Sequence, residues 1–248
     1  MNIWIAGAST GIGAALAKRY ASDGHRVFAS ARSEDKLQVL SADVQQSNHF
    51  IQPVVCDVTD NESVLNAVAQ VEAEGVIDLA ILNAGFYEPI ELENLNLEHF
   101  INTYDVNLQG VVRCFLAVLP SMKRRRSGQI AIVSSVSGYT GLPKAAAYGS
   151  SKAALINLAE SLQPECQAIG VDIRLVNPGF VKSPLTDKNS FSMPFIIEAE
   201  DAANRIVDGL NSAKFEIHFP KRFTFIMKLL GTLPYSLYLR LSSKLNTQ

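Results

Sequence analysis

The stretch NIWIAGASTGIG, residues 2–13, decides the fold that the sequence predicts. A mostly apolar run opens it and indicates a short buried strand, and three glycines follow at Gly7, Gly11 and Gly13. Apolar residues then recur at helical spacing up to Tyr20 and predict a helix. In this order, the glycines let the backbone approach a pyrophosphate, and the helix N-terminus supplies amide donors. The stretch therefore predicts a dinucleotide-binding turn, for which a simple tight turn is the alternative.

The same order of strand and helix recurs along most of the chain. Further strands are predicted at residues 26–31, 51–56, 76–82, 129–134 and 171–176. Helices are predicted at residues 33–44, from the capping-box sequence 59–62 to residue 71, and at 97–122 and 147–169. This alternation is typical of a doubly wound, mostly parallel sheet with helices on both faces. No linker or change of composition interrupts it before about residue 184, so the prediction is a single-domain α/β (Rossmann) fold over residues 1–248.

Composition argues against several classes of protein. The 248 residues are 48% hydrophobic and carry a net charge of −2, which weighs against a nucleic-acid-binding surface. No run approaches the roughly 18 apolar residues of a membrane span, and the first residues resemble a strand rather than a secretory leader. Because Cys56, Cys114 and Cys166 are widely spaced and the four histidines are scattered, we expect reduced core thiols and no metal site. The expected location is cytoplasmic.

Tyr148 and Lys152 are four residues apart in the predicted helix 147–169, so both side chains lie on one face of it. A free phenol has a pKa of about 10. An ammonium fixed beside it favours the phenolate, so the tyrosine can exchange a proton at a more neutral pH. A general acid and base for a carbonyl or an alcohol needs this property. Such a pair also arises easily by chance on a helix surface, so the other motifs must decide its meaning.

Small and polar residues follow the predicted strands at their carboxyl ends, where ligands bind in open α/β sheets. Asp57 follows the third strand, Asn83-Ala84-Gly85 the fourth, and Ser134-Ser135 the fifth. The second strand ends in Ala31-Arg32, where folds that select NAD commonly carry an acidic residue. Arg32 could instead pair with a 2′-phosphate, which favours NADP. A solvated loop charge is the alternative.

Together these motifs resemble the short-chain dehydrogenase/reductase family, of the Tyr-x-x-x-Lys type. The resemblance covers roughly residues 2–184. Its motifs are, in order, Gly7-x-x-x-Gly11-x-Gly13, Asp57, Asn83-Ala84-Gly85, Asn107, Ser135, Tyr148-x-x-x-Lys152 and Pro178-Gly179. The resemblance implies an NAD(P)-dependent oxidoreductase that interconverts a carbonyl and an alcohol, working as a homodimer or homotetramer on a small-molecule substrate.

The resemblance also implies a role for each catalytic residue. Tyr148 would give a proton to the substrate oxygen on reduction and remove it on oxidation. Lys152 would favour the phenolate and hold the ribose hydroxyls of the nicotinamide nucleotide. Ser135 would orient the substrate oxygen, although neighbouring serines leave some ambiguity. Asn107 would hold a water that links Lys152 to solvent and completes a proton relay.

The remaining motif residues are expected to bind the cofactor, which is NADP in preference to NAD. The glycine turn would contact the pyrophosphate, Asp57 the adenine, Asn83 the adenosine ribose, and Pro178-Gly179 the nicotinamide. The family often has threonine a few residues after this Pro-Gly pair, whereas Ser183 keeps the hydroxyl without the methyl. The full set is Gly7, Ser9, Thr10, Gly11, Ile12, Gly13, Arg32, Asp57, Val58, Asn83, Ala84, Gly85, Tyr148, Lys152, Pro178, Gly179, Val181 and Ser183.

Two other functions fit parts of the sequence. A binding module that senses NADP(H) without turnover would keep the nucleotide motifs, but it would not need the set of Ser135, Tyr148 and Lys152. A sugar-nucleotide epimerase or dehydratase resembles the N-terminal part, but such proteins usually have a larger C-terminal substrate domain. The favoured function is therefore that of a carbonyl reductase or alcohol dehydrogenase that prefers NADP.

Residues 184–200 are expected to determine substrate specificity, because they are unusually apolar for a connecting loop. The apolar residues are Phe191, Met193, Phe195, Ile196 and Ile197. They form either a lid over a hydrophobic substrate or ordinary packing on the body of the protein.

The tail, residues 220–248, combines cations with apolar residues at helical spacing and has no acidic residue. Phe223, Ile226, Met227 and Leu230 predict one amphipathic helix, and a second short helix follows Pro234. Such a tail packs against a partner subunit or lies on an anionic membrane surface.

Overall fold

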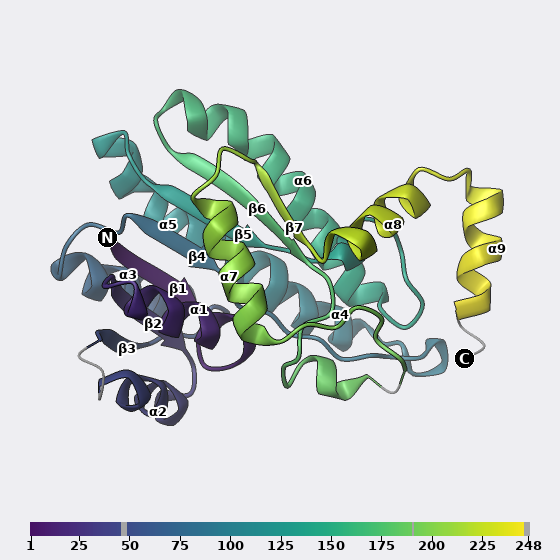
Figure 1. The fold of residues 1–248 in the computed structure, drawn as a ribbon, viewed down its shortest axis with the longest axis horizontal. Coiled ribbons are helices and arrows are strands. Elements are labelled where there is room, and N and C mark those ends of the chain that lie inside the picture. Colours follow the sequence, from purple (N-terminus) through teal and green to yellow (C-terminus); the bar gives the residue numbers. More distant parts are fainter. Residues whose placement is uncertain (46–48, 190, 246–248) are drawn as a thin grey trace.

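A computed structural model of the protein describes residues 1–45, 49–189 and 191–245. At its centre, these residues form a parallel sheet of β1 (Asn2–Ala6), β2 (Arg26–Ala31), β3 (Ile51–Val55), β4 (Leu79–Leu82), β5 (Gln129–Val133), β6 (Asp172–Pro178) and β7 (Glu216–Phe219). The strand order is β3-β2-β1-β4-β5-β6-β7, and every neighbouring pair is parallel. The chain moves outward from β1 to β3 and then returns to the other side of β1 with β4 (Figure 1). This order confirms the predicted doubly wound α/β fold.

Helices cover both faces of the sheet. One face packs against α1 (Gly11–Ser22), α2 (Glu34–Gln45) and α7 (Ala199–Leu210), and the other against α3 (Asn61–Ala73), α5 (Gly110–Arg125) and α6 (Ala146–Ala168). Successive side chains of a strand point to opposite faces. In β1, Ile3 and Ile5 therefore join the first core, whereas Trp4 and Ala6 join the second. Burial on both faces explains the continuous apolar runs of these strands.

Trp4 lies on β1, is the only tryptophan of the chain, and has a fully buried side chain. Its indole N–H donates a hydrogen bond of 2.8 Å to the hydroxyl of Ser30 on β2. A buried polar group without a partner costs free energy, so this bond allows both residues to lie in the core. It joins the two strands whose carboxyl ends carry the glycine turn and Arg32.

The predicted helix 97–122 is divided by a wider turn. The structure has α4 (Leu97–Tyr104), a π-helical turn η2 (Asp105–Gln109) and then α5. The turn η2 holds Asn107, whose side chain bonds to the backbone of Phe86. Such turns occur frequently at functional sites. The apolar spacing could not show it, because one wider turn leaves most of the pattern unchanged.

Other differences concern element ends and two elements that the sequence did not predict. The strand predicted at 76–82 is shorter, and the N-cap of α3 is Asp60 rather than Thr59, because the Asp60 carboxylate accepts from the Glu62 amide at 3.0 Å. The unpredicted elements are α7 and β7, which complete one face and one edge of the sheet. The three cysteines are buried and unpaired, as predicted.

Two helices, α8 (Lys221–Gly231) and α9 (Tyr235–Leu245), follow β7. The predicted apolar stripe of α8 is divided, since Phe223 and Met227 are buried whereas Ile226 is exposed. The cause is the rotation of α8, which turns Thr224 towards the body, where its hydroxyl lies 2.6 Å from Nδ1 of His218.

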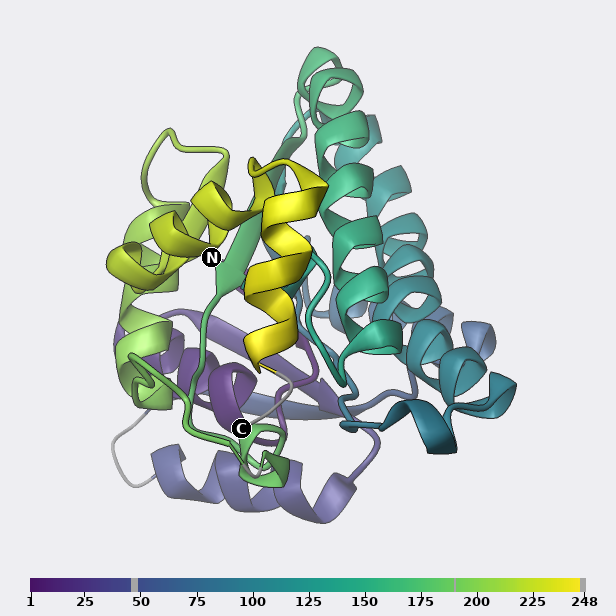
Figure 2. The same cartoon turned by 90° about the vertical axis from the view of Figure 1, so that its right-hand side faces the viewer.

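The helix α9 stands beyond α8, apart from the sheet (Figure 1), and it is the foremost element when the carboxyl ends of the strands face the viewer (Figure 2). Residues 246–248 of the predicted tail lie outside the described residues. In the part of the chain that the structure describes, no helix has the length and apolar character needed to cross a bilayer.

Candidate active site

A cavity of about 1010 Å³ lies at the carboxyl ends of the strands. It extends from Arg32 after β2 to Phe223 on α8, so one continuous space joins the glycine turn to the C-terminal helices. Every site residue predicted from the sequence lies on its wall except Gly13 and Asn107. Each of these two residues lies outside the wall and contacts residues that form it.

The glycine turn after β1 has no room for side chains. Gly7 has a φ of +88°, and a Cβ on it would lie 2.5 Å from the Cα of Ala84. A Cβ on Gly13 would overlap the carbonyl oxygen of Gly7 and lie 2.7 Å from Nδ2 of Asn83. The first turn of α1 is therefore packed directly on the backbone of the loops around it, which leaves the α1 N-terminus open to the cavity.

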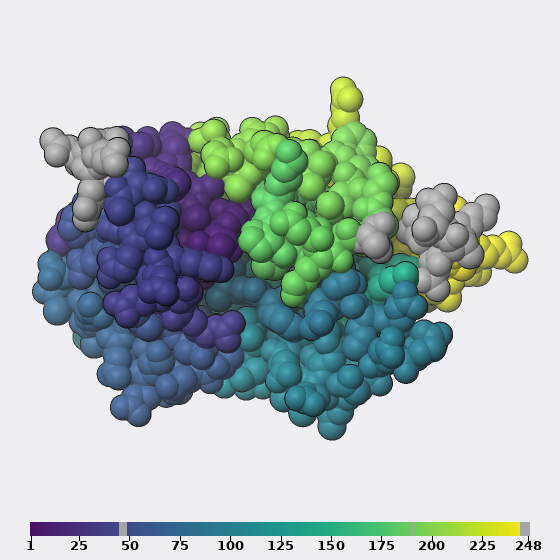
Figure 3. Space-filling view, turned by 90° about the horizontal axis from the view of Figure 1, so that it is seen from below, coloured from purple at the N-terminus to yellow at the C-terminus, as the bar shows by residue number. Residues whose placement is uncertain are grey.

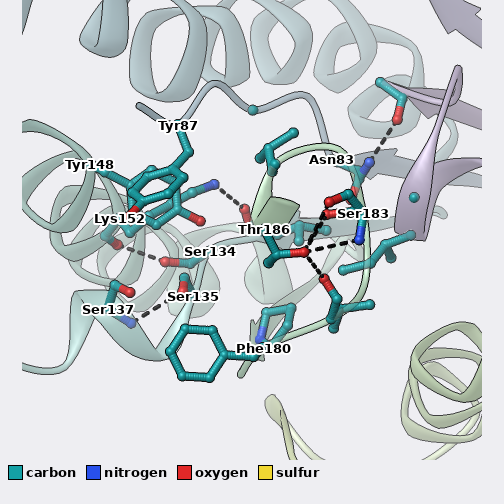
Figure 4. Close-up of a pocket in the computed structure, with 18 of the residues that line it drawn as sticks. Asn83, Tyr87, Ser134, Ser135, Ser137, Tyr148, Lys152, Phe180, Ser183 and Thr186 are labelled. Carbon is teal, nitrogen blue, oxygen red and sulfur yellow. Dashed lines mark hydrogen bonds between the residues drawn. The ribbon is translucent and has the colours of Figure 1, made fainter. Parts of the chain in front are cut away.

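Asn83 holds the glycine turn in place. Its Nδ2 donates a hydrogen bond of 2.7 Å to the carbonyl oxygen of Gly7, from the end of the adjacent strand β4 (Figure 4). The amide nitrogens of Gly7 and Ala8 both donate to the Ser30 carbonyl, at 2.8 and 2.9 Å. These bonds join the ends of β2, β1 and β4, and Asn83 contributes to the turn as well as to the wall of the cavity.

The end of the cavity beside β2 is lined by cations. Arg32, Ser33 and Lys36 line the cavity where β2 ends, whereas Glu34 and Asp35, in the first turn of α2, do not line it. Burial raises the pKa of the Asp57 carboxyl, but hydrogen bonds from the amide and hydroxyl of Thr59, at 2.9 and 2.8 Å, together with the charges of Arg32 and Arg113, leave that pKa below its usual value. Asp57 is therefore an ionised acceptor at neutral pH.

Tyr148 and Lys152 face the centre of the cavity from α6. Lys152 is buried, its Nζ donates a hydrogen bond of 3.0 Å to the carbonyl of Val133, and the same Nζ lies 5.7 Å from the centroid of the Tyr148 ring. The Lys152 side chain therefore extends past the Tyr148 ring to the end of β5. Helical spacing correctly placed the two residues on one face.

The electrostatics of this pair differ from the expectation. Burial raises the pKa of Tyr148 to about 12, and the nearby Ser135 hydroxyl lowers it by a smaller amount. Burial also lowers the pKa of Lys152 to about 8. We expected the ammonium to lower the pKa of Tyr148, and this was wrong for the polypeptide alone, because desolvation acts on both groups and disfavours both charges. At neutral pH Tyr148 is a protonated phenol.

The structure distinguishes the neighbouring serines. The Ser134 hydroxyl donates to the backbone carbonyl of Lys152 at 2.7 Å, so it joins β5 to α6 (Figure 4). The Ser135 hydroxyl lies close enough to Tyr148 to lower the pKa of its phenol, and it accepts from the amide of Ser137 at the start of η3 (Val136–Gly138), at 3.2 Å. Of these three serines, Ser135 is therefore the one whose hydroxyl meets the phenol.

Asn107 has its side chain engaged within the chain. Its Oδ1 accepts from the amide of Phe86 at 2.6 Å, and its Nδ2 donates to the Phe86 carbonyl at 2.9 Å and to the Ser151 hydroxyl at 3.1 Å. Asn107 is fully buried, and a Cβ on the neighbouring Gly85 would lie 3.8 Å from its Oδ1. Its amide fixes the loop after β4 against α6. The predicted water relay is not tested by these contacts.

Aromatic and apolar side chains form the other end of the cavity. Tyr87 meets Tyr148 edge to face with ring centroids 4.9 Å apart, and its hydroxyl donates to Oδ1 of Asn189 at 2.8 Å (Figure 4). Phe180 follows β6, and its ring stacks on that of Phe223 from α8 with centroids 5.4 Å apart. Desolvation in this region raises the pKa of Tyr87. This end is suited to an apolar ligand.

The segment 184–200 divides its apolar residues between the cavity and the core. Phe191 lines the cavity against Phe180, with centroids 5.9 Å apart, whereas Ile197 packs on the core beside α1 and α7. The base of the segment is closed by a bridge between Val181 and Ile197. Figure 3 shows the green part of the chain that contains it lying between the purple N-terminal part and the blue-green middle part. Packing on the body thus holds for Ile197, while a lid over a hydrophobic substrate stays a prediction.

Ser183 lies against the glycine turn, where a Cβ on Gly11 would approach its Cβ to 3.0 Å. Its backbone amide donates to the hydroxyl of Thr186, at the start of η4 (Thr186–Lys188), at 3.0 Å. That hydroxyl lies 2.8 Å from the carbonyl of Val181, to which it donates. Thr186 therefore shapes the turn that presents Ser183.

Sequence reasoning missed several residues on the wall. Lys36 lies in the first turn of α2, shortly after Arg32, and this nearness in sequence could have indicated a second cation at the same place. Tyr87 directly follows the Asn83-Ala84-Gly85 motif, and its position could have suggested contact with the cavity. Phe223 and Met227 had no local signal, because only the path of the chain through β7 brings α8 to this site.

Comparison with known proteins gives a consistent result. A family model described as short chain dehydrogenase matches residues 1–193. An uncharacterized oxidoreductase of Myxococcus xanthus is 36% identical over 235 residues, which are 94% of this chain and 93% of the relative. The 3-oxoacyl-(acyl-carrier-protein) reductase FabG of Rickettsia bellii is 35% identical over 184 residues, which are 74% of each chain.

A solved structure extends the similarity to the fold. The alcohol dehydrogenase from the archaeon Thermococcus sibiricus, complexed with 5-hydroxy-NADP, is 27% identical to this chain with a TM-score of 0.79. The similarity covers 88% of this chain and 95% of that one. Sequence and fold therefore agree along most of the chain.

Proposed function

Because the chain belongs to the short chain dehydrogenase family of oxidoreductases, we propose that it transfers a hydride between NADPH and a carbonyl carbon, with Tyr148 as general acid and base. The observation that carries the proposal is a single cavity that holds Tyr148, Ser135 and Lys152 together with the glycine turn. A nucleotide end and a proton donor in one space are what a carbonyl reductase requires. The single-domain organisation, the homo-oligomer and the cytoplasmic location stay predictions.

We call the part of the cavity beside the glycine turn and the end of β2 the nucleotide end. Its residues fit a dinucleotide. Amide groups at the N-terminus of α1 would hold the pyrophosphate, since the glycines leave no side chains in front of them. The ionised Asp57 and the amide of Val58 lie where the adenine would bind, next to the cations after β2. Lys152 would hold the ribose next to the nicotinamide.

Preference for NADPH over NADH rests on the charges after β2. A carboxylate at this place would bind a ribose 2′-hydroxyl and repel a 2′-phosphate, whereas Arg32 and Lys36 would attract the phosphate. The NADP analogue in the Thermococcus sibiricus relative supports the same cofactor class. We therefore propose a charge-assisted contact between the guanidinium of Arg32 and the 2′-phosphate.

In the proposed reaction, a bound nicotinamide supplies the hydride that adds to the carbonyl carbon. The carbonyl oxygen then gains negative charge and needs a proton. Tyr148 can give it because its raised pKa keeps the phenol protonated at neutral pH. The Ser135 hydroxyl, which lies near the same phenol, would align the substrate oxygen with it. The substrate in this direction is an aldehyde or a ketone.

Lys152 and Asn107 would support this proton transfer in different ways. A pKa of about 8 keeps Lys152 largely an ammonium at neutral pH, so its charge would stabilise the phenolate that remains after Tyr148 gives up its proton. Asn107 acts as a positioning residue, because its amide fixes the loop of Gly85 and Phe86 in front of Lys152.

The test is a screen for NADPH oxidation with ketones, aldehydes and 3-oxo acids, run on the wild type and on Tyr148→Phe. We expect the variant to lose about 10²–10⁴-fold in kcat, the usual contribution of a general acid, while its NADPH affinity measured by calorimetry stays the same. Tyr104→Phe is the matched control, because the Tyr104 hydroxyl bonds Ser150 away from the cavity.

Two results would contradict the proposal. Undiminished turnover by Tyr148→Phe would exclude the tyrosine as the proton donor. A wild type that binds NADPH tightly but reduces no compound in the screen would instead favour an NADP(H)-sensing module.

A further inference from the structure

The helix α8 has two apolar faces. Phe223 and Met227 are buried on the inner face, where they pack with Val136 and line the cavity. Phe225 and Leu229 point the other way and are 61% and 65% exposed. An amphipathic helix of a globular protein normally has one apolar face, directed at the core. The second face of α8 therefore needs a partner outside the described fold.

The outer face of α8 has a regular pattern of its own. Arg222, Phe225, Ile226 and Leu229 follow the spacing i, i+3, i+4 and i+7, and all four are exposed. This spacing places them on one side of a helix. The outer stripe is thus apolar along its length, with a guanidinium at its N-terminal end.

The helix α9 adds more apolar surface. Its exposed apolar side chains are Tyr235, Leu237, Leu239 and Leu241, of which Tyr235 is 82% exposed. Among its described side chains, Tyr238 is the one that is buried, and its hydroxyl donates to the carbonyl of Gly141. Outside that attachment the helix stands clear of the body (Figure 1). We call the exposed apolar residues of α8 and α9 the tail surface. They are Phe225, Ile226, Leu229, Tyr235, Leu237, Leu239 and Leu241.

The charges around the tail surface have one sign. Residues 217–248 contain five cations and no acidic residue. One of the five, Lys228, pairs with Glu216 on β7 and so fixes α8 to the body. Lys221, Arg222 and Arg240 are exposed, and none of the ion pairs in the described part of the chain involves them. The partner of this surface must therefore be apolar and bring negative charge.

We propose that the tail surface binds an anionic lipid bilayer, with its apolar side chains at the level of the acyl-chain boundary and Lys221, Arg222 and Arg240 among the headgroups. A short helix with apolar residues and cations, too short to span, binds membranes in this way. A second copy of the chain fits less well, since a two-fold contact through this surface would place cations against cations. The inference is independent of the proposed reaction.

Vesicle flotation of the full-length protein tests it. One set of vesicles is phosphatidylcholine alone, and the other is equal parts of phosphatidylcholine and phosphatidylglycerol. We expect the bound fraction to be at least about tenfold higher on the anionic vesicles, and to fall as salt is added, because each cation near the surface contributes. Binding that is equal on both vesicles, or absent from both, would overturn the proposal.

Two double variants separate the contributions. Phe225→Ser with Leu229→Ser, and Arg222→Glu with Arg240→Glu, should each lower anionic-vesicle binding by roughly tenfold or more. Leu116→Ser is the matched control, because Leu116 is 58% exposed on α5, away from the tail. Circular dichroism and thermal melts would verify that each variant is folded.

Sedimentation equilibrium decides the remaining alternative. We expect the Phe225→Ser and Leu229→Ser variant to keep the oligomeric state of the wild type. If it dissociates to a smaller species while the wild type does not float with anionic vesicles, the tail surface is a subunit interface and the proposal is wrong.

Discussion

The two ends of the cavity are constructed in different ways. The nucleotide end consists mostly of backbone at the ends of β1, β2 and β4, held by hydrogen bonds such as the one from Asn83 to Gly7. The substrate end consists of side chains, among them Tyr87, Phe180 and Phe223, from segments far apart in the chain. The first depends on local backbone conformation and tolerates little change. The second depends on which distant segments meet, so its residues can vary without disturbing the fold.

The strongest test of this difference is to add one methyl group at each end. Gly13→Ala should lower the free energy of unfolding by about 2–4 kcal/mol, because its Cβ would overlap the Gly7 carbonyl and displace Asn83. Gly141→Ala, directly before Leu142 of the substrate end, should change it by less than about 0.5 kcal/mol, because a Cβ there meets no atom within 4 Å. Urea denaturation measures both, and equal effects would contradict the comparison.

Arg32→Ala tests the charge at the nucleotide end. We expect the Kd for NADPH to rise about 10–100-fold, the usual contribution of a charge-assisted contact, while the Kd for NADH changes less than about twofold. Isothermal titration with the two cofactors provides its own control. Equal losses for both would exclude contact with the 2′-phosphate.

Lys152 lies where the two ends of the cavity meet. Because its ammonium is buried, we expect it to lower the stability of the folded protein. Lys152→Met should raise the free energy of unfolding at pH 7 by about 1–3 kcal/mol, because burial holds the pKa of Lys152 at about 8 and thus disfavours its charged form. The variant should have no measurable turnover.

The sign of this effect can be checked with pH. Between about pH 8 and 10.5, the unfolded chain keeps the proton of Lys152 whereas the folded chain has lost it, so the wild type gains stability as pH rises. The advantage of Lys152→Met should therefore shrink over this range. An advantage that is constant from pH 7 to 10.5 in urea denaturation would contradict the lowered pKa.

The smallest expected effect is at the substrate end. Met227→Ala removes a side chain from the cavity wall and should change the KM for a bulky ketone by up to about tenfold, with no change in NADPH affinity. Ile226→Ala is the matched control, since Ile226 is the exposed neighbour on the outer face of α8. Steady-state kinetics should show a change for the first variant and none for the second.

The same contrast explains what the sequence could predict. The parallel sheet, its order of strands and helices, and the placement of the nucleotide residues follow from periodicity and from glycines that act within a few residues of one another. Tyr148 and Lys152 were placed on one face because helical spacing is local. The family resemblance then identified Ser135 among three candidates; its hydroxyl lies near the phenol, and its role in orienting the substrate stays a prediction.

What could not be predicted depends on contacts across the chain. The π turn at Asn107 forms around the backbone of Phe86, and the raised pKa of Tyr148 comes from burial by many segments. The position of Phe223 and Met227 depends on β7, a four-residue strand that has little signal of its own. The division of the α8 stripe likewise requires the orientation of the helix, which spacing alone leaves open.

The buried indole of Trp4 gives this contrast a spectroscopic consequence. Since the chain has no other tryptophan, its emission reports on the core beside β1 and β2, under the nucleotide end. The helices α8 and α9 carry tyrosine and phenylalanine instead, so their unfolding leaves that fluorescence unchanged while the far-ultraviolet circular dichroism decreases. Two optical signals therefore follow the two parts of the protein separately, without a label or a substitution.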